Sequence, residues 1–200
     1  MKNAYVYLHN GFADWELGYV LPEIARPSLK MGGPDELKRN TFPVKTVSIG
    51  KQPVTSMGGL KVVPDFSLEE ISSREAAILI LPGGESWQNP QNNAGIAEKI
   101  QAFHEQKIPV AAICGAVISL ARLGILNSIK HTGNNVEELK ENAKDRYQGE
   151  ALFQKQNAVI DQGIITAGGV HPVDFAVEVM KTLNLYDPPV IDGWYNVFKG

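Results

Sequence analysis

The chain has 200 residues, a net charge of −3, 44% hydrophobic residues and 20% charged residues, as expected for one globular domain with a sizeable core. This charge gives no electrostatic reason to expect nucleic acid or an acidic membrane surface as a partner, and no apolar run is long enough to span a bilayer. One cysteine cannot form an internal disulfide, and residues 1–8 lack the features of a signal peptide, so we expect a cytoplasmic protein in a reducing compartment.

The first half of the chain alternates strand patterns with helix patterns. We expect strands at residues 5–9, 44–49 and 76–81, a helix at residues 15–24 capped by Asp14, a hairpin over residues 54–63 turning at Gly58-Gly59, a short helix capped by Ser67, and a helix at residues 94–106. Prolines and glycines at positions 22, 27, 32, 33 and 34 indicate a long irregular connection after the first helix.

The second half continues the alternation. We expect a strand at residues 108–113, a helix at residues 115–123, a polar surface helix at residues 136–144, a hairpin from residues 158–161 and 163–166, and a core helix at residues 173–183. A Pro-Pro break then precedes the aromatic tail Trp194, Tyr195 and Phe198, which either closes the core or lines a subunit contact. The alternation predicts an α/β fold with a mainly parallel sheet and helices on both faces, as a single domain over residues 1–200.

Cys114 is placed between the strand at residues 108–113 and the helix that follows it. Such a strand-to-helix turn points its side chain over the edge of the sheet, and the helix offers unpaired N–H groups and the positive end of its dipole. This setting lowers a thiol pKa and favours a thiolate, although a buried inert cysteine is the alternative. The site of such a sheet lies beyond the carboxyl ends of its strands, where Cys114 and Gly83-Gly84 both fall.

Five segments together resemble the ThiJ/PfpI family in their order and spacing. They are residues 14–17 (DWEL), 81–84 (LPGG), 112–116 (AICGA), 130–134 (KHTGN) and 165–169 (ITAGG), the last leading into DFA at residues 174–176. The resemblance implies a flavodoxin-like, glutamine-amidotransferase-like three-layer sandwich with a cysteine nucleophile elbow. It also implies a homodimer, often with the site near the interface.

The resemblance assigns catalytic roles to residues whose presence also has a simpler structural explanation. Glu16 suits the start of a helix as an acid; in the family the matching acid hydrogen-bonds the cysteine sulfur, and burial beside it would keep the carboxyl protonated. Gly83 and Gly84 suit a tight turn; in the family this loop and the residue after the cysteine resemble an oxyanion hole, whose donors here would be Gly84 and Gly115.

Histidines are placed differently here than in relatives. Proteolytic members carry His directly after the cysteine, where this chain has Gly115, and other members place a His about twenty residues later, where Asn134 aligns. His171, in the turn before the last core helix, is the preferred spare base, and His131 is a second candidate; for each, a surface or satisfied histidine is the alternative. His171-Pro172 is followed by Val173, whereas the C-terminal triad segment of the amidotransferase type is His-Pro-Glu. We therefore do not expect glutamine hydrolysis.

The remaining expectations concern the pocket and the reaction. Trp87, close after Gly84, either forms a wall of the pocket together with Asn134 and His131 or packs in the core. The histidines show no metal-ligand spacing, so we expect no metal and no cofactor. We expect a hydrolase or a glyoxalase- or deglycase-like enzyme that acts on small reactive carbonyl or amide substrates through Cys114 and Glu16. The alternatives are a non-catalytic redox-sensing stress protein that oxidises Cys114, and an intracellular protease of the family's type.

Overall fold

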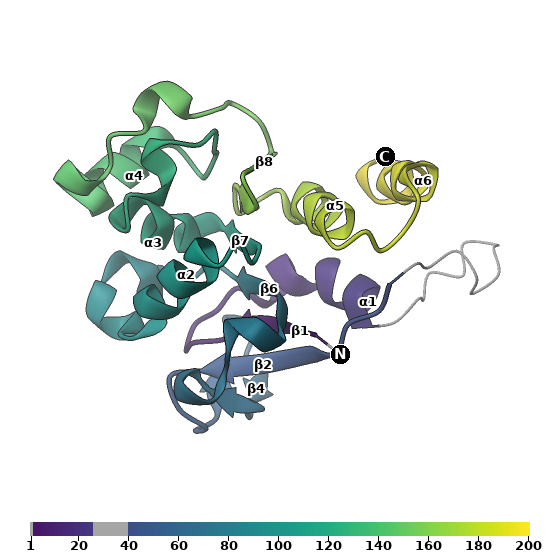
Figure 1. Ribbon diagram of the computed structural model, residues 1–200, viewed down its shortest axis with the longest axis horizontal. Helices are drawn as coiled ribbons and strands as arrows, with labels where there is room; N and C mark the ends of the chain where they lie inside the picture. Colours follow the sequence, from purple (N-terminus) through teal and green to yellow (C-terminus); the bar gives the residue numbers. More distant parts are fainter. Residues whose placement is uncertain (1, 26–39) are drawn as a thin grey trace.

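A computed structural model describes residues 2–25 and 40–200 of the chain (Figure 1). Within this part, seven strands form one sheet in the order β5-β2-β1-β6-β7-β9-β8. They are β1 (Asn3–Tyr7), β2 (Val44–Ser48), β5 (Phe66–Ser67), β6 (Ala76–Leu81), β7 (Val110–Ile113), β8 (Ala158–Asp161) and β9 (Ile164–Ala167). Every neighbouring pair is parallel except β8 and β9, which form the expected antiparallel hairpin.

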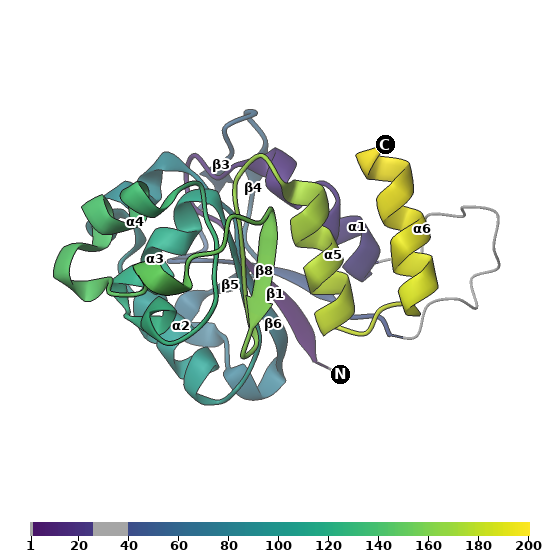
Figure 2. The same cartoon turned by 90° about the horizontal axis from the view of Figure 1, so that it is seen from above.

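Helices cover both faces of this sheet, which confirms the predicted three-layer α/β sandwich (Figure 2). One face carries α2 (Ile96–Glu105), α3 (Val117–Arg122) and α4 (Val136–Ala143); the other carries α1 (Val20–Ala25), α5 (Pro172–Thr182) and α6 (Pro188–Lys199). The strands in the middle are apolar throughout because both of their faces are covered. In β6, for example, Leu79 and Leu81 pack toward α2 and α3, whereas Ile78 and Ile80 pack toward α1 and α5.

The start of the chain differs from the expected elements. β1 lies two residues earlier than predicted, so His9 belongs to the loop after it. The first helix begins as a 3-10 turn at Asp14–Leu17 before α1, and Pro22 lies in the first turn of α1, where proline is tolerated, rather than breaking it. The positions at 27, 32, 33 and 34 lie outside the described residues.

Asp14 ties two loops together instead of capping the first helix. Its carboxylate accepts hydrogen bonds from the hydroxyl of Ser56 and from the amide of Gly58, the latter at 3.0 Å. Both donors belong to the predicted hairpin, formed by β3 (Val54–Thr55) and β4 (Lys61–Val62). Asp14 therefore anchors this hairpin beside the loop that carries Glu16.

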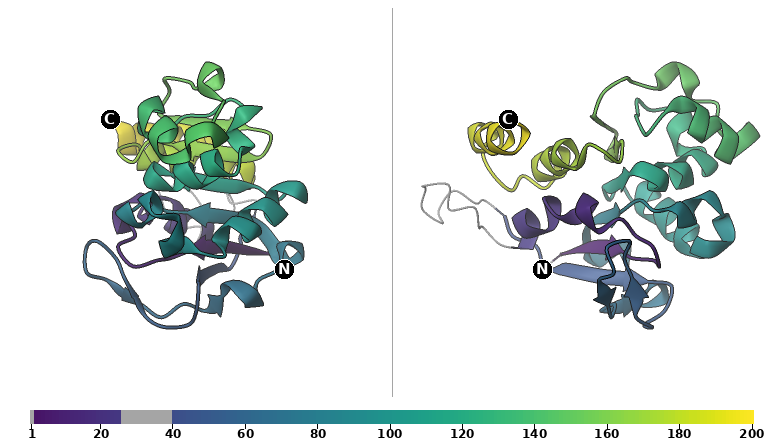
Figure 3. Two further views of the ribbon diagram at one scale, coloured as in Figure 1. Left: turned by 90° about the vertical axis from the view of Figure 1, so that its left-hand side faces the viewer. Right: turned by 180° about the vertical axis from the view of Figure 1, so that it is seen from behind.

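The aromatic tail forms a helix, α6, and this helix closes the core. The two prolines at 188 and 189 begin α6, since proline suits the first turn of a helix. Trp194 is buried and packs against Phe198 and Tyr19, with ring centroids 4.6 and 6.2 Å away. Its indole N–H also donates to the buried carboxylate of Glu23 on α1 at 3.1 Å. α6 is thus fixed beside α5 and α1 (Figure 3).

Candidate active site

Cys114 lies on the strand-to-helix turn that its sequence position predicts. β7 ends at Ile113, a 3-10 turn covers Cys114–Ala116, and α3 follows directly. The backbone φ of Cys114 is +59°, in the left-handed region that non-glycine residues rarely adopt. Strained backbone of this kind is typical of nucleophile elbows, where the turn points the side chain out over the edge of the sheet.

Cys114 opens into a pocket of about 400 Å³ at the carboxyl edge of the sheet. The loops after β1, β7 and β9 and the segment before α4 build it. Its lining residues are Trp15, Glu16, Cys114, Gly133, Asn134, Gly168, Gly169, Val170 and His171. Glu16, Asn134 and His171, which were predicted from distant parts of the sequence, are therefore brought together around the thiol.

Glu16 is completely buried in this pocket. Its Oε2 accepts a hydrogen bond from the amide of Gly83 at 2.5 Å, while Oε1 is buried without a hydrogen-bond partner. Burial raises the pKa of Glu16 to about 7, although the hydrogen bonds with Gly83 and Cys114 act in the opposite direction. Near neutral pH the carboxyl therefore exchanges a proton readily, as general acid–base catalysis requires.

The pKa of the Cys114 thiol is raised rather than lowered, which contradicts the sequence expectation. Burial is the main cause and the charge of Glu16 is the second; hydrogen bonds from Asn134 and from the amide of Gly115 lower the pKa in part. The sequence shows the helix terminus behind the thiol but not the depth of the pocket around it. Because the charge of Glu16 opposes a second anion beside it, Cys114 stays a thiol while Glu16 titrates near neutral pH.

Glycine allows the loops after β6 and β9 to approach the thiol. A Cβ on Gly83 would lie 2.5 Å from Cys114 Cβ, and one on Gly169 would lie 2.7 Å from Cys114 Sγ. Gly84 has a φ of +144°, and a Cβ there would lie 2.6 Å from a ring carbon of His9. The Gly83 amide donates to Glu16, and Gly84 and Gly115 stay the expected amide donors for a substrate oxygen.

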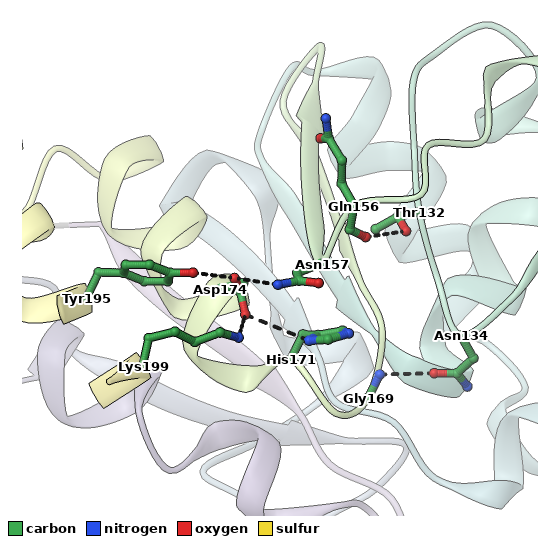
Figure 4. Close-up of polar contacts among 9 residues, drawn as sticks. All are labelled: Thr132, Asn134, Gln156, Asn157, Gly169, His171, Asp174, Tyr195 and Lys199. Atoms are coloured by element: carbon green, nitrogen blue, oxygen red, sulfur yellow. Dashed lines mark hydrogen bonds and ion pairs between the residues drawn. The ribbon is translucent and has the colours of Figure 1, made fainter. Parts of the chain in front are cut away.

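Asn134 and His171 complete the polar rim (Figure 4). The side-chain amide of Asn134 donates to Cys114 Sγ at 3.5 Å, and its oxygen accepts from the amide of Gly169 at 3.0 Å. The Gly169 bond identifies which end of the Asn134 amide faces the sulfur. His171 Nδ1 is buried without a hydrogen-bond partner and lies 3.9 Å from Oδ2 of Asp174.

His131 and Trp87 were expected in the pocket but lie elsewhere in the fold. His131 is completely buried, with its ring nitrogens 2.8 Å from the carbonyl of Ile129 and from the hydroxyl of Tyr147. Trp87 is buried beneath the elbow, where its indole N–H donates to the carbonyl of Pro82 at 2.8 Å. Both side chains satisfy their polar atoms inside the protein, so they face the core and not the pocket.

Five lining residues were not among the candidate site residues predicted from the sequence: Trp15, Gly133, Gly168, Gly169 and Val170. Trp15 and Val170 are 52% and 84% exposed and lie at the mouth, where they give a ligand an apolar contact. The sequence could have indicated Gly169, because the Gly168-Gly169 doublet follows an apolar strand just as Gly83-Gly84 does. A doublet in that place indicates a close approach of the backbone to another group.

The described residues offer neither a cluster of metal ligands nor a membrane-spanning helix. Across residues 2–25 and 40–200, no three His, Cys, Asp or Glu side chains are grouped closely enough to hold a metal ion. In the same part of the chain, no helix combines the length and the apolar character needed to cross a bilayer.

Comparison with known proteins gives consistent matches over nearly the whole chain. A model described as DJ-1/PfpI family matches residues 2–182. A Bacillus subtilis protein named "Uncharacterized protease YoaZ" is 35% identical over 198 residues, which cover 99% of this chain and 91% of that protein. The solved structure of a thiJ/pfpI family protein from Bacillus anthracis is 36% identical with a TM-score of 0.85, covering 99% of this chain and 90% of that one. A DJ-1 superfamily protein from Agrobacterium tumefaciens is 33% identical with a TM-score of 0.83, covering 99% and 97%.

More distant relatives carry other names. "Glutathione-independent glyoxalase DJR-1.2" of Caenorhabditis elegans is 25% identical over 151 residues, covering 74% of this chain and 77% of that protein. "Deglycase PfpI" of Pyrococcus furiosus is 29% identical over 96 residues, covering 48% of this chain and 58% of that protein. The names protease, glyoxalase and deglycase therefore all occur among the relatives.

Proposed function

The chain belongs to the DJ-1/PfpI family, and from this we propose that it is a cysteine-dependent enzyme acting on small, uncharged, reactive carbonyl compounds through Cys114 and Glu16. The observation that carries the proposal is the fully buried Glu16 carboxyl beside the thiol, with a pKa raised to about 7 by burial. A group that titrates near neutral pH both accepts and returns a proton during a catalytic cycle.

The reaction begins with attack of the Cys114 sulfur on the carbonyl carbon. Ionised Glu16 takes the thiol proton, an S–C bond forms, the π electron pair of the carbonyl moves to its oxygen, and Glu16 returns the same proton to that oxygen to give a hemithioacetal. The amides of Gly84 and Gly115 are the proposed donors to the developing oxyanion. His171, at the pocket rim, is the proposed second proton carrier for the later release of product.

The lining of the pocket supports an uncharged substrate. None of the described lining residues is Lys or Arg, the side chains that recognise carboxylates and phosphates. Trp15 and Val170 offer apolar contacts at the mouth instead. We therefore propose an aldehyde or dicarbonyl with an apolar substituent in preference to an acid or a phosphorylated sugar.

General protease activity is not proposed, although relatives carry that name. Peptide hydrolysis needs a base for the nucleophile and an acid for the leaving amine. Gly115 and Asn134, which occupy the positions where relatives keep histidine, do not titrate. Of the histidines in the described part of the chain, His171 lines the pocket and offers an alternative. A group from a second copy of the chain is another, and a homodimer remains a prediction from the family resemblance.

Redox sensing is the second candidate function. Here the Cys114 sulfur would be oxidised to a sulfinate by a peroxide. The unpartnered Oε1 of Glu16 favours it, because a protonated carboxyl there has a hydrogen bond to donate to an oxygen on sulfur. Mass spectrometry of the intact protein after graded peroxide treatment would show a gain of two oxygens at Cys114 if this function applies.

Turnover assays with the purified protein test the main proposal. We expect consumption of phenylglyoxal, an uncharged dicarbonyl with an apolar ring, and little cleavage of denatured casein. Cys114→Ala should abolish turnover, whereas Glu85→Gln, a change at an exposed carboxylate outside the lining, should leave it intact. Efficient casein cleavage that is lost in Cys114→Ala would replace this proposal with a protease.

A further inference from the structure

α6 lies beyond the region that the family model matches, yet two of its side chains contact Asp174, an acid close to the pocket residue His171. The matched region ends at residue 182, and α6 covers Pro188–Lys199. From this helix Lys199 Nζ contacts Asp174 Oδ2 at 2.6 Å, and the hydroxyl of Tyr195 donates to Asp174 Oδ1 at 3.1 Å (Figure 4). Asp174 lies in the first turn of α5, three residues after His171 of the Cys114 pocket.

One carboxylate oxygen is the nearest acceptor for two different groups. Oδ2 of Asp174 is held by Lys199 at 2.6 Å and lies 3.9 Å from His171 Nδ1, beyond hydrogen-bond distance. Nδ1 is buried and without a hydrogen-bond partner. An unpaired buried nitrogen is costly, so closing this gap would be favourable if the oxygen were released.

The other oxygen of Asp174 is also occupied. Oδ1 accepts from Asn157 at 3.1 Å in addition to Tyr195. The side chain is only 12% exposed, so water does not readily supply a replacement. The hydrogen bonds from Lys199, Asn157 and Tyr195 hold the pKa of Asp174 below its usual value, against the opposing effect of burial. The carboxylate is therefore charged and engaged on both oxygens.

We propose that Lys199 is a positioning residue that competes with His171 for Asp174 Oδ2, so that the seating of α6 decides whether His171 has a carboxylate partner. With Lys199 seated, His171 lacks one. With Lys199 removed, His171 Nδ1–H donates to Oδ2, and Nε2 becomes the ring's only acceptor, a stronger base for the Cys114 thiol proton. The inference rests on the proposed role of His171 as a proton carrier.

Two other titratable groups line the pocket of His171 and are held constant in the test. Glu16 and Cys114 line the same pocket from the loops after β1 and β7. Lys181, on α5 itself, pairs with Glu178 at 2.9 Å and not with Asp174. Lys181→Met is therefore a matched control for Lys199→Met, since each change removes one lysine that forms an ion pair with an acid on α5.

The test uses two measurements on the full chain that need no turnover. Ring ¹⁵N shifts of His171, assigned with His171→Gln, report which nitrogen carries the proton. The rate of Cys114 alkylation by iodoacetamide between pH 6 and 9 reports the availability of thiolate. In Lys199→Met we expect a larger Nδ1–H population and an alkylation rate at pH 7 about two- to tenfold higher, the range that one net hydrogen bond gives.

Three further variants identify the cause of such a rise. Lys199→Arg keeps a cation on Asp174 and should behave as the unmodified chain, whereas Lys199→Met combined with Asp174→Asn should lose the rise. Tyr195→Phe removes a donor from Oδ1 only and should change the tautomer less. Equal results for Lys199→Met and Lys181→Met, or a fall in both readouts, would overturn the proposal. If the expected shifts appear and phenylglyoxal is not consumed, the proposed function fails and this inference stands.

Discussion

At the scale of single residues, the site depends on a buried pair of groups that cannot both be charged. Glu16 has no access to solvent, and Cys114 is the nearest titratable neighbour that the pocket provides. The charge of Glu16 raises the pKa of the Cys114 thiol in addition to the effect of burial, whereas the hydrogen bond with Cys114 lowers the pKa of Glu16. The proton on Glu16 therefore decides how readily the sulfur ionises.

Glu16→Gln should lower the pKa of the Cys114 thiol. The amide keeps an oxygen for the Gly83 N–H but removes the negative charge that opposes the thiolate. Alkylation rates measured against pH should show a midpoint lower by about one unit, the usual effect of one close charge. Glu85→Gln is the control and should not move this midpoint. An unchanged or higher midpoint in Glu16→Gln would show that the charge of Glu16 does not raise the pKa of the thiol.

The contact between His131 and Tyr147 allows a test of whether His131 has a structural role. The His131 ring is held at both nitrogens, and burial lowers its pKa. Tyr147→Phe leaves Nε2 of His131 without its partner, so we expect the free energy of unfolding to fall by about 1–3 kcal/mol. The alkylation profile of Cys114 should stay unchanged, because His131 is outside the pocket; a shifted profile would return His131 to the catalytic site.

At the scale of elements, the active site is a meeting of loops at one edge of the sheet. The order of the strands places β7 between β6 and β9, so the turns after these three strands converge. The glycine doublets after β6 and β9 let two of the turns press against the elbow. Such a convergence was predictable for the turn after β6, since a parallel sheet gathers its functional groups at its carboxyl edge.

Gly169→Ala should close the space around the thiol. The added Cβ would lie 2.7 Å from Cys114 Sγ, so the turn after β9 or the elbow must shift. We expect the alkylation rate to fall about tenfold or more, and a stability loss of about 1–3 kcal/mol from overpacking. Gly50→Ala, where a Cβ meets no atom within 4 Å, is the control and should stay within about 0.5 kcal/mol. Similar alkylation rates in both variants would show that the turn after β9 shifts easily to make room for the added Cβ.

The elements that the sequence predicted well are those with strong local patterns. β6 and β7 are short apolar runs, and Cys114 stands where an apolar run changes to a helical pattern, so their placement was predictable. α6 was not predicted as a helix, because Pro188 and Pro189 indicate a break in sequence but suit the first turn of a helix in the fold. Its contacts with Asp174 depend on three-dimensional packing that no local pattern records.

At the scale of the whole molecule, burial decided the site assignments that the sequence left open. His171 was the preferred spare base, and His131 and Trp87 were further candidates; the packing places the last two in the core and His171 at the pocket rim. The direction of the thiol pKa has the same origin, since desolvation is a property of the assembled fold. The single domain, the homodimer and the cytoplasmic location stay predictions.

The buried titratable groups give the molecule opposing dependences of stability on pH. Burial lowers the pKa of His9 and of His131. Because these rings resist protonation in the fold, the unfolded chain binds more protons below about pH 6.5, and their effect is to reduce stability as the pH falls. Glu16 acts in the opposite direction, because its pKa is raised. A difference between two variants is therefore needed to isolate Glu16.

Glu16→Gln should become more stable relative to the unmodified chain as the pH rises. Burial raises the pKa of Glu16 from 4.5 to about 7. Below pH 4.5 the folded and the unfolded state both hold the proton of Glu16. Between pH 4.5 and about 7 the unfolded state loses this proton first, so the unmodified chain becomes less stable as the pH rises. This loss of stability is complete above about pH 7. The full difference is about 3 kcal/mol. Urea unfolding of both proteins at pH 4, 6 and 8 measures it, with Glu85→Gln as the control; a difference that stays constant across this range would mean that Glu16 is charged in the fold throughout.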